Sequence, residues 1–155
     1  MKIRLLTVSH KQPDWVQAGC QDFERRLPRE WGFQVVEVKP GARTSGAPVA
    51  KVQADEAQRL LAAVPKGARL VALDERGVGW STRDLAHRLQ QWQQDGRDLA
   101  LVIGGADGLA DEVLRAAEVR LSLSAMTMPH GLVRIVVVEQ LYRAATVLQG
   151  HPYHK

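Results

Sequence analysis

Apolar and polar segments alternate along the chain in a way that predicts strands and helices in turn. Short apolar or β-branched runs with the length of buried strands occupy residues 2–8, 33–38, 70–73, 99–103 and 119–123. The run 99–103 is wholly apolar and ends at Gly104-Gly105, as a central parallel strand does. The pattern therefore predicts five strands in a sheet that is largely parallel.

Between these runs, apolar residues recur at helical spacing. The first stripe starts after Pro13 and should stop at Pro28; its members are Trp15, Gly19, Phe23 and Leu27. Further helices are predicted at residues 49–64, 81–95, 109–117 and 132–149. Ser81 with Asp84 three residues later is a capping signature, and Gly96 ends that helix. Strand and helix thus alternate throughout, which predicts an α/β fold: a parallel-rich sheet with helices on both faces.

The last predicted helix carries apolar residues on more than one side. One stripe consists of Val133, Val137, Leu141 and Leu148, and beside it lie Leu132, Ile135 and Val136. One protomer's sheet covers one stripe, so the other predicts a second protein surface, for which a symmetric homodimer is the commonest solution. The alternative is that residues 136–138 form a strand, which periodicity does not exclude.

Length and composition limit the class of protein. At 155 residues the chain is about one domain long, and residues 1–155 show neither a repeat nor a linker. The apolar start of the chain is too short for a signal-peptide core, and no apolar run approaches the ~20 residues of a membrane span. We therefore expect a cytoplasmic protein.

Net charge and cysteine content limit the possible partners and sites only slightly. The net charge of +4 raises the expectation of a phosphate-bearing partner only modestly. Cys20 is the single cysteine, which excludes an intramolecular disulfide and a cysteine-cluster zinc site. We expect it to be a small apolar residue in a helix.

Ligands of parallel α/β sheets bind beyond the carboxyl ends of the strands, so the loops after Leu73, Ile103 and Leu123 are the places to inspect. Residues 104–108 contain three glycines, which permit either close approach to a ligand or a plain tight turn. Residues 124–131 combine small residues with two methionines and either hold a flat apolar group or fill the core. No dinucleotide fingerprint follows the first strand.

The carboxyl terminus gathers unusual chemistry for a chain end. Tyr153 can stack on a base, Lys155 can meet phosphate, and His154 is an imidazole suited to proton transfer near neutral pH. A metal is not expected, because no carboxylate or cysteine lies close in sequence to the two terminal histidines. His10, His87 and His130 stand alone and are expected to be structural.

Five motifs in order resemble one family. They are 101–105 (LVIGG), 121–124 (LSLS), 129–130 (PH), 141–144 (LYRA) and 151–155 (HPYHK). The chain resembles the bacterial ribosomal RNA large subunit methyltransferase H family, of the SPOUT class, over nearly its whole length. Ala106-Asp107 departs from the pair often found there, which leaves the role of those two side chains open.

The resemblance implies both fold and activity. It implies a trefoil knot in the carboxyl-terminal part, a homodimer, and transfer of a methyl group from S-adenosylmethionine to N3 of a pseudouridine in 23S rRNA of the large ribosomal subunit, with no metal. By the family pattern, the residues that line the S-adenosylmethionine site are Leu73, Gly104, Leu123, Ser124, Ala125, Met126, Thr127 and Met128. Two rival classes remain: a non-enzymatic RNA-binding module and a doubly wound enzyme for a small molecule.

The acceptor imide is a weak acid, so its nitrogen must lose a proton near the transition state. His154 is the candidate general base, with water as the alternative, and Tyr153 and Lys155 are candidate RNA contacts. Further candidate RNA contacts, each also readable as a solvated charge, are Arg25, Arg26, Arg29, Lys39, Arg43 and Lys51. The sequence leaves two questions open. One is which protomer supplies the carboxyl-terminal residues to each site, and the other is whether free RNA, the subunit or the ribosome is the substrate.

Overall fold

The computed structural model describes residues 1–44 and 46–155; Ser45, in the predicted loop 39–48, lies outside the described residues. The strands are β1 (Ile3–Val8), β2 (Gln34–Val38), β3 (Arg69–Gly79), β4 (Leu99–Ile103) and β5 (Val119–Ser122). The helices are α1 (Asp14–Glu24), α2 (Val49–Ala63), α3 (Thr82–Asp95), α4 (Asp111–Ala116) and α5 (His130–Gln149), with 3-10 turns η1 (Arg29–Trp31) and η2 (Pro152–His154).

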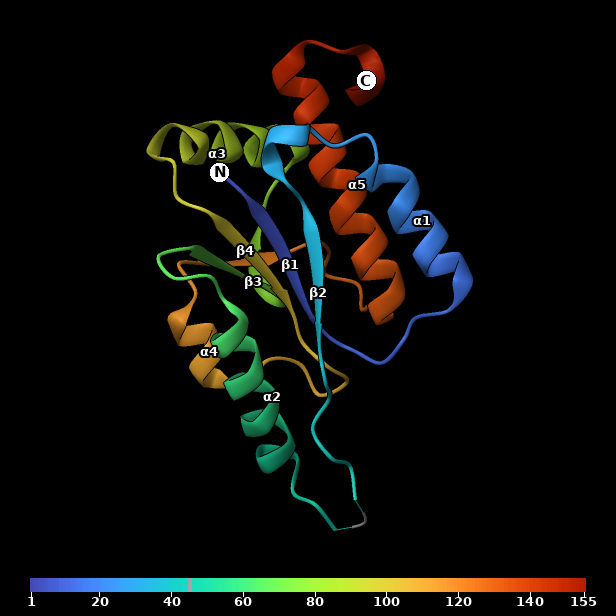
Figure 1. Ribbon diagram of the computed structural model, residues 1–155, viewed down its shortest axis with the longest axis vertical. Coiled ribbons are helices and arrows are strands. Elements are labelled where there is room, and N and C mark those ends of the chain that lie inside the picture. The colour runs from blue at the N-terminus through green and yellow to red at the C-terminus, as the bar shows by residue number, and fades with distance from the viewer. Residues whose placement is uncertain (45) are drawn as a thin grey trace.

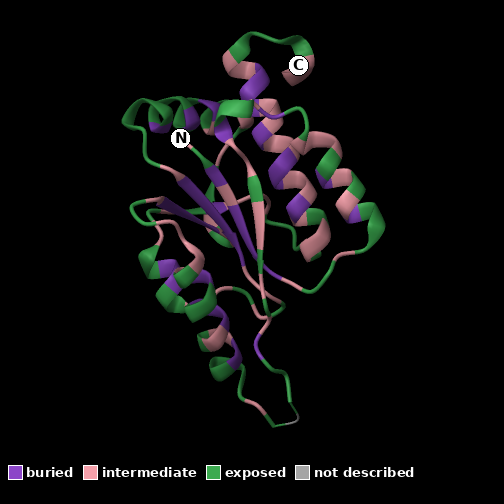
Figure 2. Cartoon of the chain, in the orientation of Figure 1, coloured by how far each residue is buried: buried purple, intermediate pink, exposed green. Residues whose placement is uncertain are grey.

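The five strands form one sheet in the order β2-β1-β4-β3-β5, and every pairing is parallel. Helices α1, α3 and α5 cover one face, and α2 and α4 cover the other (Figure 1). Each face has its own apolar core, as the buried strands and inner helix faces in Figure 2 show. The predicted fold class is confirmed.

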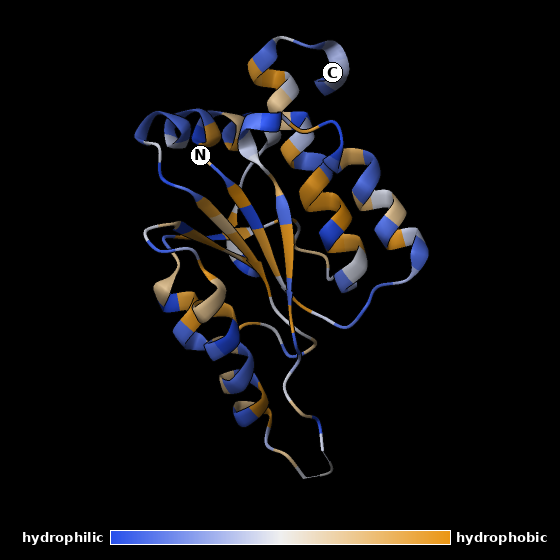
Figure 3. Ribbon diagram, in the orientation of Figure 1, coloured by the Kyte–Doolittle hydropathy of each residue, from blue (hydrophilic) through white to orange (hydrophobic). Residues whose placement is uncertain are grey.

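The centre of the sheet matches the sequence pattern most closely. β4 has the predicted bounds, all five of its residues are buried, and it pairs with β1 and β3. A strand with neighbours on both edges and helices on both faces must be apolar throughout, and Figure 3 shows the strands as the most hydrophobic part of the chain. The capping box at α3 is also as predicted: the Ser81 hydroxyl accepts from Asp84 N, and Ser81 N donates back to the Asp84 carboxylate.

Strand β3 and helix α1 end at residues other than those predicted. β3 does not stop at Leu73 but continues to Gly79 beside β5, and its register shifts so that Leu73 and Val78 both face Leu121. The polar residues between them bulge out of the ladder, which is why they resemble a loop in sequence. α1 ends at Glu24 rather than near Pro28, and Trp15 is 59% exposed instead of facing the core.

The two apolar sides of α5 contact different elements of the same chain. Val137 and Leu141 pack on the sheet, whereas the opposite neighbour is α1, where the absence of a side chain at Gly19 leaves room for Ile135. A Cβ on Gly19 would lie 2.9 Å from Ile135 Cδ1. α1 therefore contacts Ile135 within the chain, but Ile135 remains only half-buried. A second protein surface over this side of α5 stays a prediction. Residues 136–138 are helical, so the strand alternative is excluded; the knot stays a prediction.

Cys20 lies on the buried side of α1 with 4% exposure, as expected for a small apolar residue. Burial raises the pKa of its thiol to about 11. Within the described chain, no helix is both long and apolar enough to cross a membrane.

Candidate functional site

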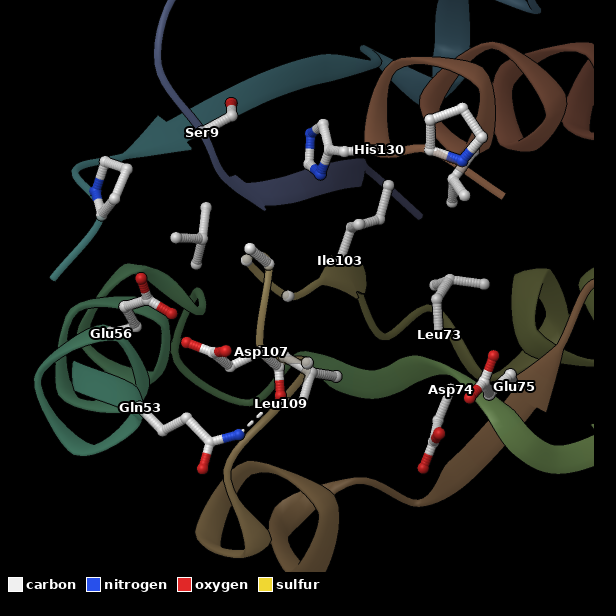
Figure 4. Close-up of a pocket in the computed structure, with 18 of the residues that line it drawn as sticks. Ser9, Gln53, Glu56, Leu73, Asp74, Glu75, Ile103, Asp107, Leu109 and His130 are labelled. Atoms are coloured by element: carbon white, nitrogen blue, oxygen red, sulfur yellow. Dashed lines mark hydrogen bonds between the residues drawn. The ribbon is translucent and has the colours of Figure 1, made fainter. Parts of the chain in front are cut away.

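A cavity of about 1330 Å³ opens at the carboxyl ends of β1 and β4 and beside the bulge of β3. Figure 4 shows its walls, with Leu73 and Ile103 on one side and Gln53 and Glu56 on the other. The cavity exceeds the upper range of about 1,000 Å³ typical of a single small-ligand pocket. It therefore has room for a cofactor and for part of a second molecule.

The apolar half of the cavity is built by strand ends. Its side chains are Leu73, Ile103, Leu121, Leu123 and Val133. All the predicted cofactor-site residues line the cavity except Ala125, which is exposed beside it; the lining ones are Leu73, Gly104, Leu123, Ser124, Met126, Thr127 and Met128. The three strand-end segments chosen from the sequence thus meet at one place.

Residues 104–108, here called the glycine loop, form a tight turn. Gly108 N donates to the Gly105 carbonyl at 3.0 Å, and Gly108 has a φ of +79°, which favours glycine. A Cβ on Gly104 would lie 2.7 Å from the Gly108 carbonyl carbon. The packing of the turn against itself therefore requires Gly104, whether or not a ligand also approaches it.

A turn also shapes residues 123–129, which cross the cavity from β5 to α5. Met126 N donates to the Ser124 hydroxyl at 2.9 Å, and the Thr127 hydroxyl donates to Glu75 at 3.3 Å. Met126 is 78% exposed, so it is not core filler. Pro129 caps α5, and the segment presents backbone and small side chains to the cavity.

A buried arginine supports the start of α5. Arg134 is 4% exposed and donates to the hydroxyls of Thr7 at 3.1 Å and Ser9 at 2.7 Å, and it pairs with Glu37 at 3.4 Å. Its Nη2 also lies 3.4 Å from His130 Nε2. Because Arg134 only donates, this contact favours the neutral imidazole with a lone pair on Nε2.

His130 and Gly104 both line the cavity, and an interaction with the Gly104 backbone partly offsets the lowering of the His130 pKa by burial. Burial, followed by the positive charge of Arg134, lowers the pKa of its imidazole. The expected structural role of His130 is consistent with this position, because it ties the first residue of α5 to the glycine loop.

The polar half of the cavity joins α2 to two loops. We call residues 39–44 the basic loop, after Lys39 and Arg43. Arg43 forms an ion pair with Asp107 of the glycine loop at 2.6 Å, and Gln53 of α2 donates to the Asp107 carbonyl at 2.7 Å (Figure 4). Glu56 is 3% exposed and accepts from Gly41 N at 2.9 Å.

Carboxylates outnumber cations around the cavity. Asp74 and Glu75, which lie in the bulge of β3, line it together with Glu56 and Asp107, and Asp74 pairs with Arg76 at 3.3 Å. An excess of carboxylates in a partly enclosed space favours a ligand that carries positive charge.

The carboxyl-terminal tail folds onto the far end of α5. The Tyr153 ring lies 4.6 Å from that of Tyr142, and the Arg143 guanidinium lies 4.8 Å from the Tyr153 ring centroid. Tyr153 Oη donates to Glu139 at 3.3 Å, and burial and Glu139 raise the pKa of Tyr153. The structure therefore brings the tail residues Tyr153, His154 and Lys155 to a site separate from the cavity (Figure 1).

Sequence reasoning missed Glu56 and Arg134, the buried charged residues beside the cavity. Each lies on an apolar helix face where a charge interrupts the pattern, which is a weak signal. Their partners, Gly41 and Thr7, are 15 and 127 residues away in sequence, so only the fold reveals the contacts.

Comparisons with known proteins agree with this architecture. A family model described as "Predicted SPOUT methyltransferase" matches residues 1–154. A solved putative methylase family protein from Neisseria gonorrhoeae superposes with a TM-score of 0.57 over 91% of this chain and 81% of that one, at 18% identity, so the likeness concerns the fold alone. The chain is a SPOUT methyltransferase.

Sequence relatives narrow this class. Proteins named "Ribosomal RNA large subunit methyltransferase H" from Burkholderia cenocepacia and Burkholderia ambifaria are 52% and 51% identical to the chain. Both matches cover 100% of this chain and 99% of the relative. The chain belongs to the family of these methyltransferases, as the sequence motifs indicated.

Proposed function

We propose that the protein transfers a methyl group from S-adenosylmethionine to N3 of a pseudouridine in 23S rRNA of the large ribosomal subunit. The observation that carries the proposal is the meeting of the three segments chosen from the sequence around one cavity that has apolar walls and more carboxylates than cations. The names of the relatives support a ribosomal RNA substrate.

The residues of the cavity fit this methyl donor. Leu73, Ile103 and Leu123 offer a flat apolar surface for an adenine, and residues 123–129 offer backbone groups for its edge. Asp74, Glu75 and Glu56 favour the positive charge of the donor. When bound, S-adenosylmethionine supplies a methyl group on a sulfonium, which is already electrophilic, so the protein has to align the acceptor and manage its proton.

His154 is the proposed base that takes the proton from the acceptor imide. Its Nδ1 lies 2.5 Å from the His151 carbonyl oxygen, which only accepts hydrogen bonds, so in the neutral imidazole Nδ1 carries the proton and Nε2 the lone pair. That tautomer is the one a general base needs. Tyr153 and Lys155 are proposed to contact RNA, the former by stacking and the latter at phosphate.

The tail must act on the cavity of a second copy. A helix of 20 residues spans roughly 30 Å, and α5 has that length between the cavity and the tail. We infer a homodimer whose two-fold axis crosses α5, so that each tail reaches the partner's cavity.

Exposed apolar residues mark the surface proposed for the partner. Trp15 is 59% and Leu132 38% exposed. They adjoin Val16 and Gly131, which are in close contact between α1 and α5, so both lie at the cavity end of these helices. A partner seated there would cover them and would bring its tail to the cavity.

The basic residues suggested from sequence form separate groups that this dimer would bring together. Lys39 and Arg43 lie at the cavity, whereas Arg26 stacks on Tyr142, 5.2 Å from its ring centroid, near the tail. Arg25 and Arg29 are exposed close to Arg26 in sequence, and Lys51 is exposed on α2. Phosphates of a folded RNA need such an extended basic surface.

Calorimetry with S-adenosylmethionine, followed by methyl transfer onto ribosomes from a strain that lacks the enzyme, tests the proposal. We expect binding at the cavity and one methyl group on N3 of a 23S rRNA pseudouridine, located by mass spectrometry. Binding of the donor with no methylation of ribosomes, subunits or free rRNA would rule out this substrate.

A further inference from the structure

Glu56 is a buried charged residue whose hydrogen bonds are incomplete. One carboxylate oxygen accepts from Gly41 N at 2.9 Å, and the other is buried with no hydrogen-bond partner among the described residues. The side chain faces the cavity region from α2 (Figure 4). Burying a carboxylate with an unpaired oxygen costs stability, so packing alone does not explain the residue.

The carboxylate of Glu56 lies between two loops. Gly41 belongs to the basic loop, and Gly105 belongs to the glycine loop. A Cβ on Gly105 would lie 2.9 and 3.2 Å from the two Glu56 oxygens. A movement of either loop therefore changes the surroundings of the same carboxylate.

Other contacts tie the same loops together. Arg43 of the basic loop pairs with Asp107 of the glycine loop at 2.6 Å. Arg59 of α2 donates to the carbonyls of Lys39 and Pro40 at 2.8 and 2.9 Å. The two loops and α2 thus form one connected network, and Glu56 is its buried member.

We propose that Glu56 is a positioning residue that couples the basic loop to the glycine loop, so that RNA binding and methyl-donor binding strengthen each other. The inference rests on the proposed function, since RNA contacts the basic loop and the donor contacts the glycine loop. RNA that orders the basic loop holds Gly41 against Glu56, and the carboxylate then holds Gly105 in place. By linkage, the donor strengthens RNA binding by the same factor.

Equilibrium dialysis with radiolabelled S-adenosylhomocysteine, which cannot react, measures the coupling. The dissociation constant is compared for the full-length protein alone and with excess ribosomes from a strain that lacks the enzyme. We expect at least about fivefold tighter binding with ribosomes, the lower end of typical coupling between two sites.

The variants Glu56→Gln and Glu56→Ala should bring this ratio close to one. The matched control is Asp55→Asn, which removes a charge from the adjacent position of α2 and, as far as the described residues show, lies outside the cavity lining; it should keep the wild-type ratio. Glu56→Gln preserves the side-chain volume and removes a buried charge with an unpaired oxygen, so its Tm should be unchanged or higher. Should Glu56→Ala fail to fold, Glu56→Gln carries the test.

Three results would overturn the inference. The first is a wild-type protein that binds the probe equally well with and without ribosomes. The second is a Glu56→Gln variant whose binding is strengthened by ribosomes as much as that of the wild type. The third is a Glu56→Gln variant that loses coupling and also has a lower Tm, which would make the residue structural. A wild-type protein that methylates ribosomes without coupling contradicts only this inference. A wild-type protein that neither binds the probe nor methylates contradicts the proposed function itself.

Discussion

His130 and Gln149 are the first and last residues of α5, and they place the cavity and the carboxyl-terminal tail roughly 30 Å apart in one chain. His130 lines the cavity, and the tail folds back onto Tyr142 at the other end. A role for His154 in the reaction therefore depends on a second copy.

Replacing the proposed base should separate chemistry from binding. His154→Ala is expected to lower the single-turnover rate on ribosomes by about 10²- to 10⁴-fold, the range for loss of a general base. Its affinity for S-adenosylmethionine should be almost unchanged, since His154 lies outside the cavity of its own chain. His151→Ala serves as a control for loss of a tail imidazole. An unchanged rate in His154→Ala would show that water or another group takes the proton from the acceptor imide.

A charge at the exposed apolar surface should separate the protomers. Trp15→Glu places a carboxylate where 59% of the tryptophan surface is exposed, so the monomer should fold normally. In a dimer the same carboxylate would be buried without a partner, which is costly. Sedimentation velocity should show a wild-type dimer and a Trp15→Glu monomer that has lost methyl transfer. A monomeric wild-type protein at micromolar concentration would contradict the dimer.

The buried imidazole of His130 should make stability depend on pH. Burial and Arg134 lower its pKa in the folded state below the ordinary value of 6.5. A depressed folded pKa contributes stability that is present above pH 6.5 and is lost as pH falls toward the folded value, because the unfolded chain takes up the proton first.

Urea unfolding of wild type and His130→Gln between pH 8 and pH 5, a range chosen about the ordinary histidine pKa, measures this contribution. The wild type should lose more stability below about pH 6.5 than His130→Gln does. His87→Gln, which replaces an exposed histidine on α3, should follow the wild type. Parallel curves for wild type and His130→Gln would show that His130 does not lose its proton affinity on folding.

Cys20 should be chemically inert in the folded protein. Burial raises its pKa to about 11, and only the thiolate is a strong nucleophile. A disulfide reagent at neutral pH should label the native protein far more slowly than the protein in urea. Rapid labelling of the native state would indicate that α1 opens easily.

Much of the fold follows from the sequence pattern because its central elements are apolar for a local reason. β4 is buried on every side, so Leu99 to Ile103 form an uninterrupted run bounded by turn residues. The cavity could also be placed, since parallel strands end at one edge of the sheet and Gly104 and Leu123 follow two of them.

The missed features depend on contacts between distant segments. The extension of β3 past Leu73 was hidden because the residues that bulge from the ladder are polar. α1 contacts Ile135 at Gly19, a neighbour that apolar periodicity does not identify. The buried charges of Glu56 and Arg134 become intelligible only with Gly41 and Thr7 beside them, because periodicity identifies which face is buried and not what lies opposite.

Activity of mixed dimers tests the central claim most directly. Ser124→Trp should fill the cavity and abolish donor binding, whereas its control, Ser124→Ala, removes only a hydroxyl that accepts from Met126 N. Ser124→Trp and His154→Ala should each be inactive as homodimers. After unfolding and refolding together, half of the dimers are mixed and one of their two sites has an intact cavity and an intact partner tail, which predicts about a quarter of the wild-type rate on ribosomes. No recovery of activity, with mixed dimers demonstrated by mass spectrometry, would contradict a cavity completed by the partner's tail.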